Sequence, residues 1–226
     1  MKSVTISYMN SVIHITLAAN EELSGRLDRL RIEFAKACNT IAPIAQANHC
    51  WNRVALHHLT YHRLRELFPD LGSQMVCNAI YSVCRSYRLL LGHPQSPFFS
   101  QKIPEGNLPQ IFFLDHSPVF FDRHTLSLQN NVLSMFTLEG RLRFGIGLNE
   151  VDEKRFRTER LREVQLLSAG SQYSMMLFFD ALTNKQFAAQ DVSAWPDYMV
   201  LKDQPLKNGL QNLEAQNTLA ILKDAS

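Results

Sequence analysis

The sequence has 226 residues, of which 46% are hydrophobic and 19% charged, with a net charge of +2 and a pI near 8.4. This length fits one large domain or two small ones, and this apolar content supports a packed core, which excludes an intrinsically disordered chain. No run approaches the roughly 18 uninterrupted apolar residues of a membrane span, and the N-terminus lacks the apolar segment of a secretory signal. We therefore expect a cytoplasmic protein without a membrane partner.

Residues 3–18 alternate apolar and polar side chains, which predicts two short strands joined by a turn at about Met9 to Ser11. Each strand has one apolar face. The apolar positions are Val4, Ile6 and Tyr8 in the first strand, and Ile13, Ile15 and Leu17 in the second.

The next segment has helical spacing of apolar residues and predicts three helices. The first begins after Asn20, a capping residue that two glutamates follow, and Pro43 should perturb its far end. The second spans about residues 52–68, and the third runs from Ser73, read as its cap, to Gly92. The positions expected to be buried are Leu23, Leu27, Leu30, Phe34 and Ile41, then Leu56, Leu59, Leu64 and Leu67, then Val76, Ile80, Val83 or Cys84, and Tyr87.

A proline-rich connector spans residues 92–109, and short strand-like runs follow it. Their short spacing and turn-rich links predict a small antiparallel barrel. The expected fold class is therefore α+β, with a barrel of residues 1–19 and 95–180, a helical bundle of residues 20–94 inserted after the first strand pair, and a tail of residues 181–226. The tail either docks on the body, pairs with a partner or stays loose. The strand-like runs begin at residues 111, 118, 125, 132, 141, 164 and 173.

Charge is distributed unevenly along the chain. Residues 141–162 contain seven basic and four acidic side chains, whereas residues 163–226 contain seven acidic side chains and four lysines. Arg141 and Arg143 are two apart in a strand-like run, so both should project from one face of a sheet. This pattern favours a polyanion partner for the body, although an ordinary solvated surface fits the same counts.

The second predicted helix has the densest group of chemically active side chains. His58 and His62 have the spacing of two metal ligands, but the glutamate of an H-E-x-x-H motif is missing, so a metal site is disfavoured. Another line of residues combines basic side chains with a tyrosine. Such a combination can bind phosphates and stack on bases, but it is also found on an ordinary solvent-exposed helix face. This line consists of His49, Arg53, His57, Tyr61 and Arg65.

The third helix begins with polar side chains suited to reading base edges, although Ser73 also fits a cap and Gln74 a solvated position. The four polar residues are Ser73, Gln74, Cys77 and Asn78, and Tyr81, Arg85 and Arg88 follow on one side. The four cysteines form no C-x-x-C pair, so buried free thiols are expected. No catalytic triad or phosphate-binding glycine loop is visible, and we expect no catalytic residue, metal or cofactor.

Five motifs follow one another along the chain. They are W-N-x-x-x-L-H-H-L-x-Y-x-x-L-R-x-x-F (Trp51–Phe68), L-G-S-Q (Leu71–Gln74), S-Y-R (Ser86–Arg88), F-D-R-H-T-L-S-L (Phe121–Leu128) and T-L-E-G-R-L-R-F (Thr137–Phe144). In order and spacing they resemble the N-terminal half of TnpB, the transposon-associated RNA-guided DNA nuclease and relative of type V CRISPR effectors. The resemblance covers about residues 3–180.

The resemblance implies an OB-like wedge barrel interrupted by a helical recognition unit, which together hold a structured guide RNA and read a target-adjacent double-stranded DNA motif. It implies that Ser73, Gln74, Cys77 and Asn78, with Tyr61, lie near that DNA. It also places Arg123, Arg141 and Arg143 near RNA or the RNA–DNA hybrid. The other expected nucleic-acid-binding residues are Arg53, His57, Arg65, Arg85, Arg88, Arg155 and Arg157.

The sequence departs from the family after Asp180, where the G-x-D-x-G type motif that opens a RuvC-like nuclease does not occur. A two-metal nuclease needs its carboxylates, so this chain is expected not to cut DNA by itself. The resemblance thus implies a nuclease-lacking protein of the prokaryotic cytoplasm, associated with the nucleoid when it is bound to DNA. Its partner is either a separate RuvC chain or a second copy. The alternative is a scaffold or regulator that no longer binds nucleic acid.

Overall fold

The computed structural model describes residues 6–9, 12–92, 96, 98, 108–170, 172–179 and 196–202. These residues form an α+β fold of four helices and ten strands. The helices are α1 (Glu21–Ala47), α2 (Arg53–Leu67), α3 (Ser73–Gly92) and α4 (Glu150–Thr158). The strands are β1 (Ile6–Met9), β2 (Val12–Leu17), β3 (Gln110–Phe113), β4 (Val119–Phe121), β5 (Leu126–Gln129), β6 (Val132–Thr137), β7 (Gly140–Gly145), β8 (Leu161–Ala169), β9 (Gln172–Phe179) and β10 (Met199–Lys202).

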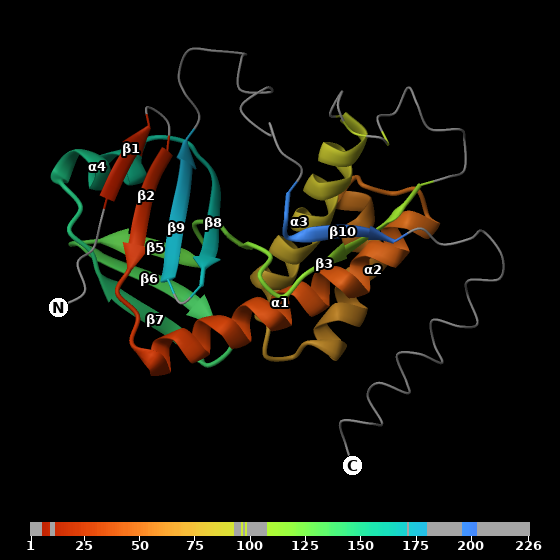
Figure 1. Ribbon diagram of the computed structural model, residues 1–226, viewed down its shortest axis with the longest axis horizontal. Helices are drawn as coiled ribbons and strands as arrows, with labels where there is room; N and C mark the ends of the chain where they lie inside the picture. Colours follow the sequence, from red (N-terminus) through yellow and green to blue (C-terminus); the bar gives the residue numbers. More distant parts are fainter. Residues whose placement is uncertain are drawn as a thin grey trace.

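The described strands form three antiparallel sheets, with the orders β1-β2-β9-β8-β4, β5-β6-β7 and β10-β3. In Figure 1 the three-stranded sheet crosses behind the five-stranded one, and α2 and α3 lie at the other end of the molecule, with α1 running between the two ends. None of the three sheets closes into a barrel within the described ranges. The helices α1 to α3 do follow the first strand pair in the chain, as predicted.

The longest helix, α1, begins where the sequence predicts. The side chain of Asn20 accepts a hydrogen bond from the backbone N–H of Leu23 at 2.9 Å, and two glutamates occupy the first turn. Pro43 does not end the helix, which continues to Ala47. Ile41, Ala42 and Ala45 are fully buried, and this burial stabilises the last turns despite the hydrogen bond that proline cannot donate.

The buried face of α2 differs from the predicted one. Leu59 and Leu67 are 51% and 48% exposed, whereas Leu56, Thr60 and Leu64 are buried. Because these three residues are spaced four apart, they form one line along the helix. Thr60 fits this line because its hydroxyl donates to the backbone carbonyl of Leu56 at 2.7 Å.

The sequence did not predict helix α4 or strand β10, and the predicted strand β3 has an unexpected partner. Helix α4 carries its acidic side chains in the first turn and basic ones in the last, with Asn149 as its cap. Strand β3 was expected in the barrel, but it pairs with β10 from the predicted tail. Asn39 of α1 fixes β3 with two hydrogen bonds, accepting from the Phe113 N–H at 2.7 Å and donating to the Phe113 carbonyl at 2.9 Å. The rest of the predicted tail and most of the predicted connector lie outside the described residues.

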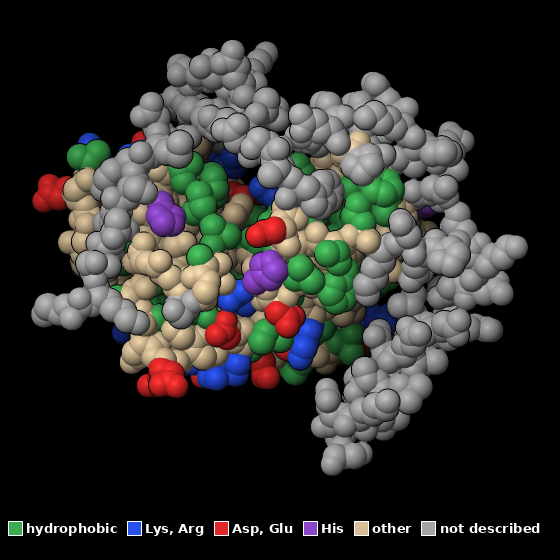
Figure 2. Space-filling view, viewed as in Figure 1, with side chains coloured by type: hydrophobic (Ala, Val, Ile, Leu, Met, Phe, Trp, Pro, Cys, Tyr) green, Lys and Arg blue, Asp and Glu red, His purple; other side chains and the backbone are tan. Residues whose placement is uncertain are grey.

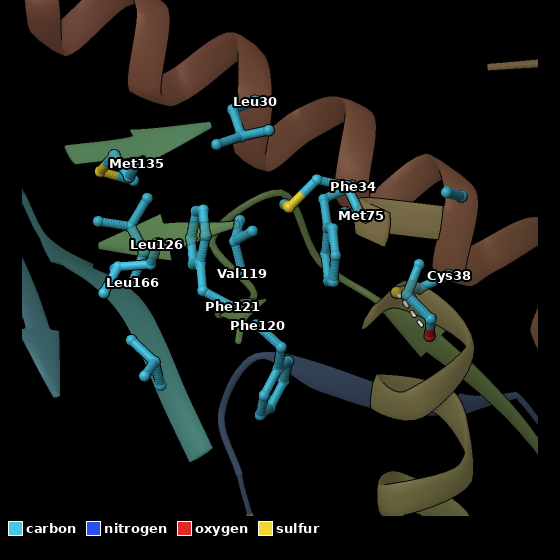
Figure 3. Close-up of a cluster of buried hydrophobic side chains, with 14 of the residues drawn as sticks. Leu30, Phe34, Cys38, Met75, Val119, Phe120, Phe121, Leu126, Met135 and Leu166 are labelled. Atoms are coloured by element: carbon cyan, nitrogen blue, oxygen red, sulfur yellow. Dashed lines mark hydrogen bonds between the residues drawn. The ribbon is translucent and has the colours of Figure 1, made fainter. Parts of the chain in front are cut away.

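A single hydrophobic core joins the helices to the sheets. Figure 3 shows Leu30 and Phe34 of α1 facing β4, with Met135 of β6 and Leu166 of β8 nearby. The predicted helical and barrel regions therefore pack as one body in the described residues. This packing places α3 directly against β4 and β8, where the candidate site lies.

Candidate nucleic-acid interface

A charged and aromatic cluster lies where α3 meets the five-stranded sheet. The Tyr81 hydroxyl donates to Glu163 Oε2 at 2.7 Å, and Arg85 Nε donates to the same oxygen at 2.8 Å. Gln165 donates to the other carboxylate oxygen. The side chain of Glu163 is only 10% exposed, so three neighbouring donors compensate for the burial of its charge.

Aromatic rings support the arginines of this cluster. The Arg53 guanidinium, from the first residue of α2, lies 5.5 Å from the centre of the Tyr81 ring, and that of Arg85 lies 5.5 Å from the centre of the Phe120 ring. Tyr81 and Phe120 meet edge to face at 5.6 Å. We call Arg53, Tyr81, Arg85, Phe120 and Glu163 the Tyr81 cluster.

The electrostatics of the Tyr81 cluster keep its phenol protonated. Burial, followed by the Glu163 carboxylate, raises the pKa of Tyr81, while Arg85 and Arg162 act in the opposite direction. Arg162 therefore lies within electrostatic range of the cluster. Arg53 and Arg162 are both exposed and lie outside the Arg85–Glu163 ion pair.

Arg88 is a further exposed arginine on α3. Burial raises the pKa of the Cys84 thiol to about 11, and the charges of Arg88 and Arg53 oppose that increase. Arg88 is exposed and makes no hydrogen bond or ion pair within the described ranges, and the same is true of Arg53. Among the described residues, both guanidinium groups therefore have donors without an acceptor.

The residues predicted to read DNA are mostly used inside the protein. Gln74 donates to the Asp122 carboxylate, and Asn78, only 4% exposed, donates to Thr125 Oγ1 at 3.5 Å. These contacts attach the start of α3 to the turn between β4 and β5. Ser73 is exposed but is the first residue of the helix rather than its cap, and Cys77 is half-buried with a pKa raised by burial. The structure thus leaves Ser73 as the exposed member of this group.

The predicted line on α2 is also divided. His57 and Tyr61 stack at 4.5 Å between ring centres, and both rings are half-buried. Arg65, at the end of the helix, donates to the backbone carbonyl of Leu71 at 2.6 Å and so holds the turn between α2 and α3. His49 lies before α2 and so is not on this helix, and Arg53 alone of the five predicted residues belongs to the Tyr81 cluster.

The basic side chains between residues 141 and 162 are partly neutralised by their own segment. Arg155 pairs with Glu159 at 3.0 Å and lies over the Phe179 ring, and Arg157 lies 3.8 Å from Glu153. Arg123 donates to the Glu159 carbonyl at 2.7 Å. These arginines stabilise α4 and its contacts with the sheets.

Arg141 and Arg143 do share the outward face of β7, as predicted, with Leu142 and Phe144 buried on the other face. Arg141 lies 4.2 Å from the centre of the Phe136 ring and donates to Ser134. Arg143 is exposed and has no hydrogen bond or ion pair in the part of the chain that the structure describes. The two arginines are therefore not equivalent.

Sequence reasoning missed three residues that organise these surfaces, namely Glu163, Asp122 and Phe136. The contacts that join Glu163 and Asp122 to α3 are distant in the chain, because Arg85 is 78 residues from Glu163 and Gln74 is 48 residues from Asp122. Phe136 carried a signal, since the apolar alternation of β6 buries Leu133 and Met135 and leaves Phe136 on the outward face.

Other kinds of site are not supported by the described residues. Among them, no three His, Cys, Asp or Glu side chains gather in a way that could hold a metal ion. No helix found in those residues has both the length and the apolar character to cross a membrane. On the face shown in Figure 2, acidic and basic side chains intermingle along the lower edge, where α1 runs, so that edge is not a uniformly basic surface.

Comparison with known proteins adds no relative. No protein-family model matches the chain, and no curated protein has a significantly similar sequence. The likeness to TnpB therefore depends on the five motifs alone.

Proposed function

We propose that this chain is a nuclease-lacking protein, resembling the N-terminal half of TnpB, that binds a structured guide RNA and a target-adjacent DNA motif. It acts either as one subunit of a split RNA-guided effector, with a RuvC nuclease on a separate chain, or as an RNA-guided DNA binder. The five- and three-stranded sheets are the part we assign to an OB-like wedge, in an open form. The helices α1 to α3 are the part we assign to the recognition unit.

The observation that carries this proposal is a set of three exposed arginines on the elements that meet at the Tyr81 cluster: Arg53 over the Tyr81 ring, Arg88 on α3 and Arg162 on β8. Arg53, Arg88 and Arg162 are exposed and make no hydrogen bond or ion pair with the described residues. Guanidinium groups bind phosphate oxygens through two parallel hydrogen bonds, and they also stack on bases. Because the Tyr81 ring supports Arg53, less side-chain freedom is lost when that arginine binds a phosphate.

The proposal is tested with the RNA that copurifies with the full chain. This RNA is sequenced and transcribed in vitro, and its affinity for the protein is measured at several salt concentrations. If about 6–10 phosphates are contacted, affinity should fall roughly 10³- to 10⁵-fold between about 50 and 200 mM salt. The triple variant Arg53→Ala, Arg88→Ala, Arg162→Ala should bind this RNA much more weakly and depend less on salt. The triple variant Arg29→Ala, Lys36→Ala, Lys154→Ala removes the same number of charges elsewhere and is the matched control. A flat salt response, or equal losses in both variants, would contradict RNA binding at this site.

A second candidate function is a scaffold or regulator of an RNA-guided effector. It is favoured by the internal use of Arg65, Arg85, Arg123 and Arg155, which donate to carbonyls or carboxylates of the chain itself. Copurification separates the two functions. An absorbance at 260 nm that RNase removes supports nucleic-acid binding, whereas a protein partner without nucleic acid supports the scaffold.

A further inference from the structure

The outward face of the three-stranded sheet combines an exposed aromatic ring with arginines. Phe136 on β6 is 39% exposed even though the Arg141 guanidinium lies over its ring. Strand register places Phe136 opposite Arg141, and Ser134 opposite both Ser127 and Arg143. We call this surface the stacking face, and it consists of Ser127, Gln129, Val132, Ser134, Phe136, Arg141 and Arg143.

The stacking face carries positive charge without an acidic neighbour on its strands. Its outward positions on β5, β6 and β7 include no carboxylate. The adjoining acids are used by other groups: Glu139 pairs with Arg26 at 3.1 Å and with Arg29 at 2.6 Å on α1, and Glu153 accepts from the Asn130 N–H at 3.0 Å. The field above the face therefore favours an anionic ligand.

We propose that the stacking face binds unpaired nucleotides of an RNA strand, an inference that rests on the proposed function and identifies a second RNA contact. One base stacks on Phe136, beside the Arg141 guanidinium, and Arg143 pairs with a backbone phosphate. An aromatic ring on an open sheet next to arginines is a combination that recognises unstacked bases. A protein partner fits less well, because the apolar side chains exposed on this face are Val132 and Phe136, too few for a hydrophobic interface.

The serines of the stacking face favour RNA over DNA. Ser127 and Ser134 lie directly opposite each other and in the same row as Arg143. The Ser127 hydroxyl makes no hydrogen bond to the described residues, so it can bind a ribose 2′-hydroxyl beside the phosphate that Arg143 holds. A deoxyribose strand lacks that group and should bind more weakly.

Fluorescence anisotropy with the full chain and a fluorescein-labelled oligouridine of about 12 nucleotides tests this proposal. The Phe136→Ala variant should bind roughly 5- to 100-fold more weakly, since stacking on an aromatic side chain contributes about that factor per base. Phe136→Trp should restore binding. Val151→Ala is the control, because Val151 lies on α4, outside the stacking face, and is 67% exposed, so this change should leave affinity unchanged.

Several results would contradict the proposal that the stacking face binds RNA. Equal affinity of the wild type and Phe136→Ala would do so, as would equal affinity for oligodeoxythymidine of the same length. A change in sedimentation of the free Phe136→Ala protein, without a change in RNA affinity, would assign the face to self-association. If the protein does not bind oligouridine while its binding of the copurified RNA still depends on Arg53, Arg88 and Arg162, RNA binding by the stacking face is contradicted. The proposed function is then still supported. Unchanged melting of Phe136→Ala shows that the fold is intact.

Discussion

Arg85 of α3 and Glu163 of β8 form an ion pair with 2.8 Å between Nε and Oε2, and the carboxylate is almost buried. Tyr81 donates to the same oxygen, so this one atom connects two residues of the helical region to the five-stranded sheet. The pair has a structural role as well as a place in the candidate site. The structural role can be measured as the contribution of Glu163 to the free energy of unfolding.

Replacing Glu163 with alanine should lower the free energy of unfolding by about 2–4 kcal/mol, because the change leaves the half-buried Arg85 and Tyr81 without their acceptor. Urea titration followed by circular dichroism measures this loss. The control is Glu139→Ala, which breaks more exposed ion pairs with Arg26 and Arg29 and should cost about 1 kcal/mol or less. Equal losses in the two variants would show that the contacts of Glu163 add no special stability.

Stability should decrease in alkaline solution. Burial raises the pKa of the Cys38 thiol from 9.0 to about 12. The folded state therefore holds a proton that the unfolded state releases above pH 9, and stability falls as pH rises from about 9 towards 12. At pH 10 the loss from Cys38 should be roughly 1 kcal/mol. Melting curves at pH 7.5 and pH 10 check this, with Cys38→Ala expected to show a smaller difference between the two pH values. An identical difference in the variant would contradict the assignment.

The two hydrogen bonds between Asn39 and Phe113 predict a large effect from a half-buried polar side chain. Asn39→Ala leaves both the N–H and the carbonyl of Phe113 without this partner, which should cost about 2–3 kcal/mol of unfolding free energy. Lys36→Ala, an exposed position on the same helix, should change stability by less than about 0.5 kcal/mol. Chemical denaturation of both variants makes the comparison, and a similar small loss in each would show that β3 does not depend on Asn39.

Local sequence patterns predicted most helices and strands of this fold, because helix caps and apolar periodicity depend on residues close together in the chain. Period-two alternation located β5, β6 and β7, and helical spacing located α1 and α2, with Asn20 marking the start of α1. Partners distant in the chain were not predictable in the same way. The pairing of β3 with β10 depends on residues roughly 90 positions apart, and the alternation of one strand does not specify which strand it pairs with.

The candidate site shows the same limit. The sequence predicted that arginines would be exposed, but it did not show which of them bind acids or carbonyls within the chain. Arg65 and Arg123 each donate to a backbone carbonyl, and such an acceptor exists at every position, so no sequence pattern marks it. Arg53 and Arg88 differ from these arginines in being exposed without such an acceptor among the described residues, and this difference arises only from the packing of α2 on α3.

Arg141 and Arg143 should respond differently to replacement, although both lie on one face of β7. Arg143 makes no hydrogen bond with the described residues, so Arg143→Ala should leave the melting temperature unchanged and lower RNA affinity, with the salt slope reduced by about one. Arg141 lies over Phe136 and donates to Ser134, so Arg141→Ala should cost about 1 kcal/mol of stability as well as RNA affinity. Thermal melting and titrations with the copurified RNA, each repeated on the single variants, separate these effects. A drop in melting temperature with Arg143→Ala would mean that this arginine is structural, and an unchanged RNA affinity would remove β7 from the interface.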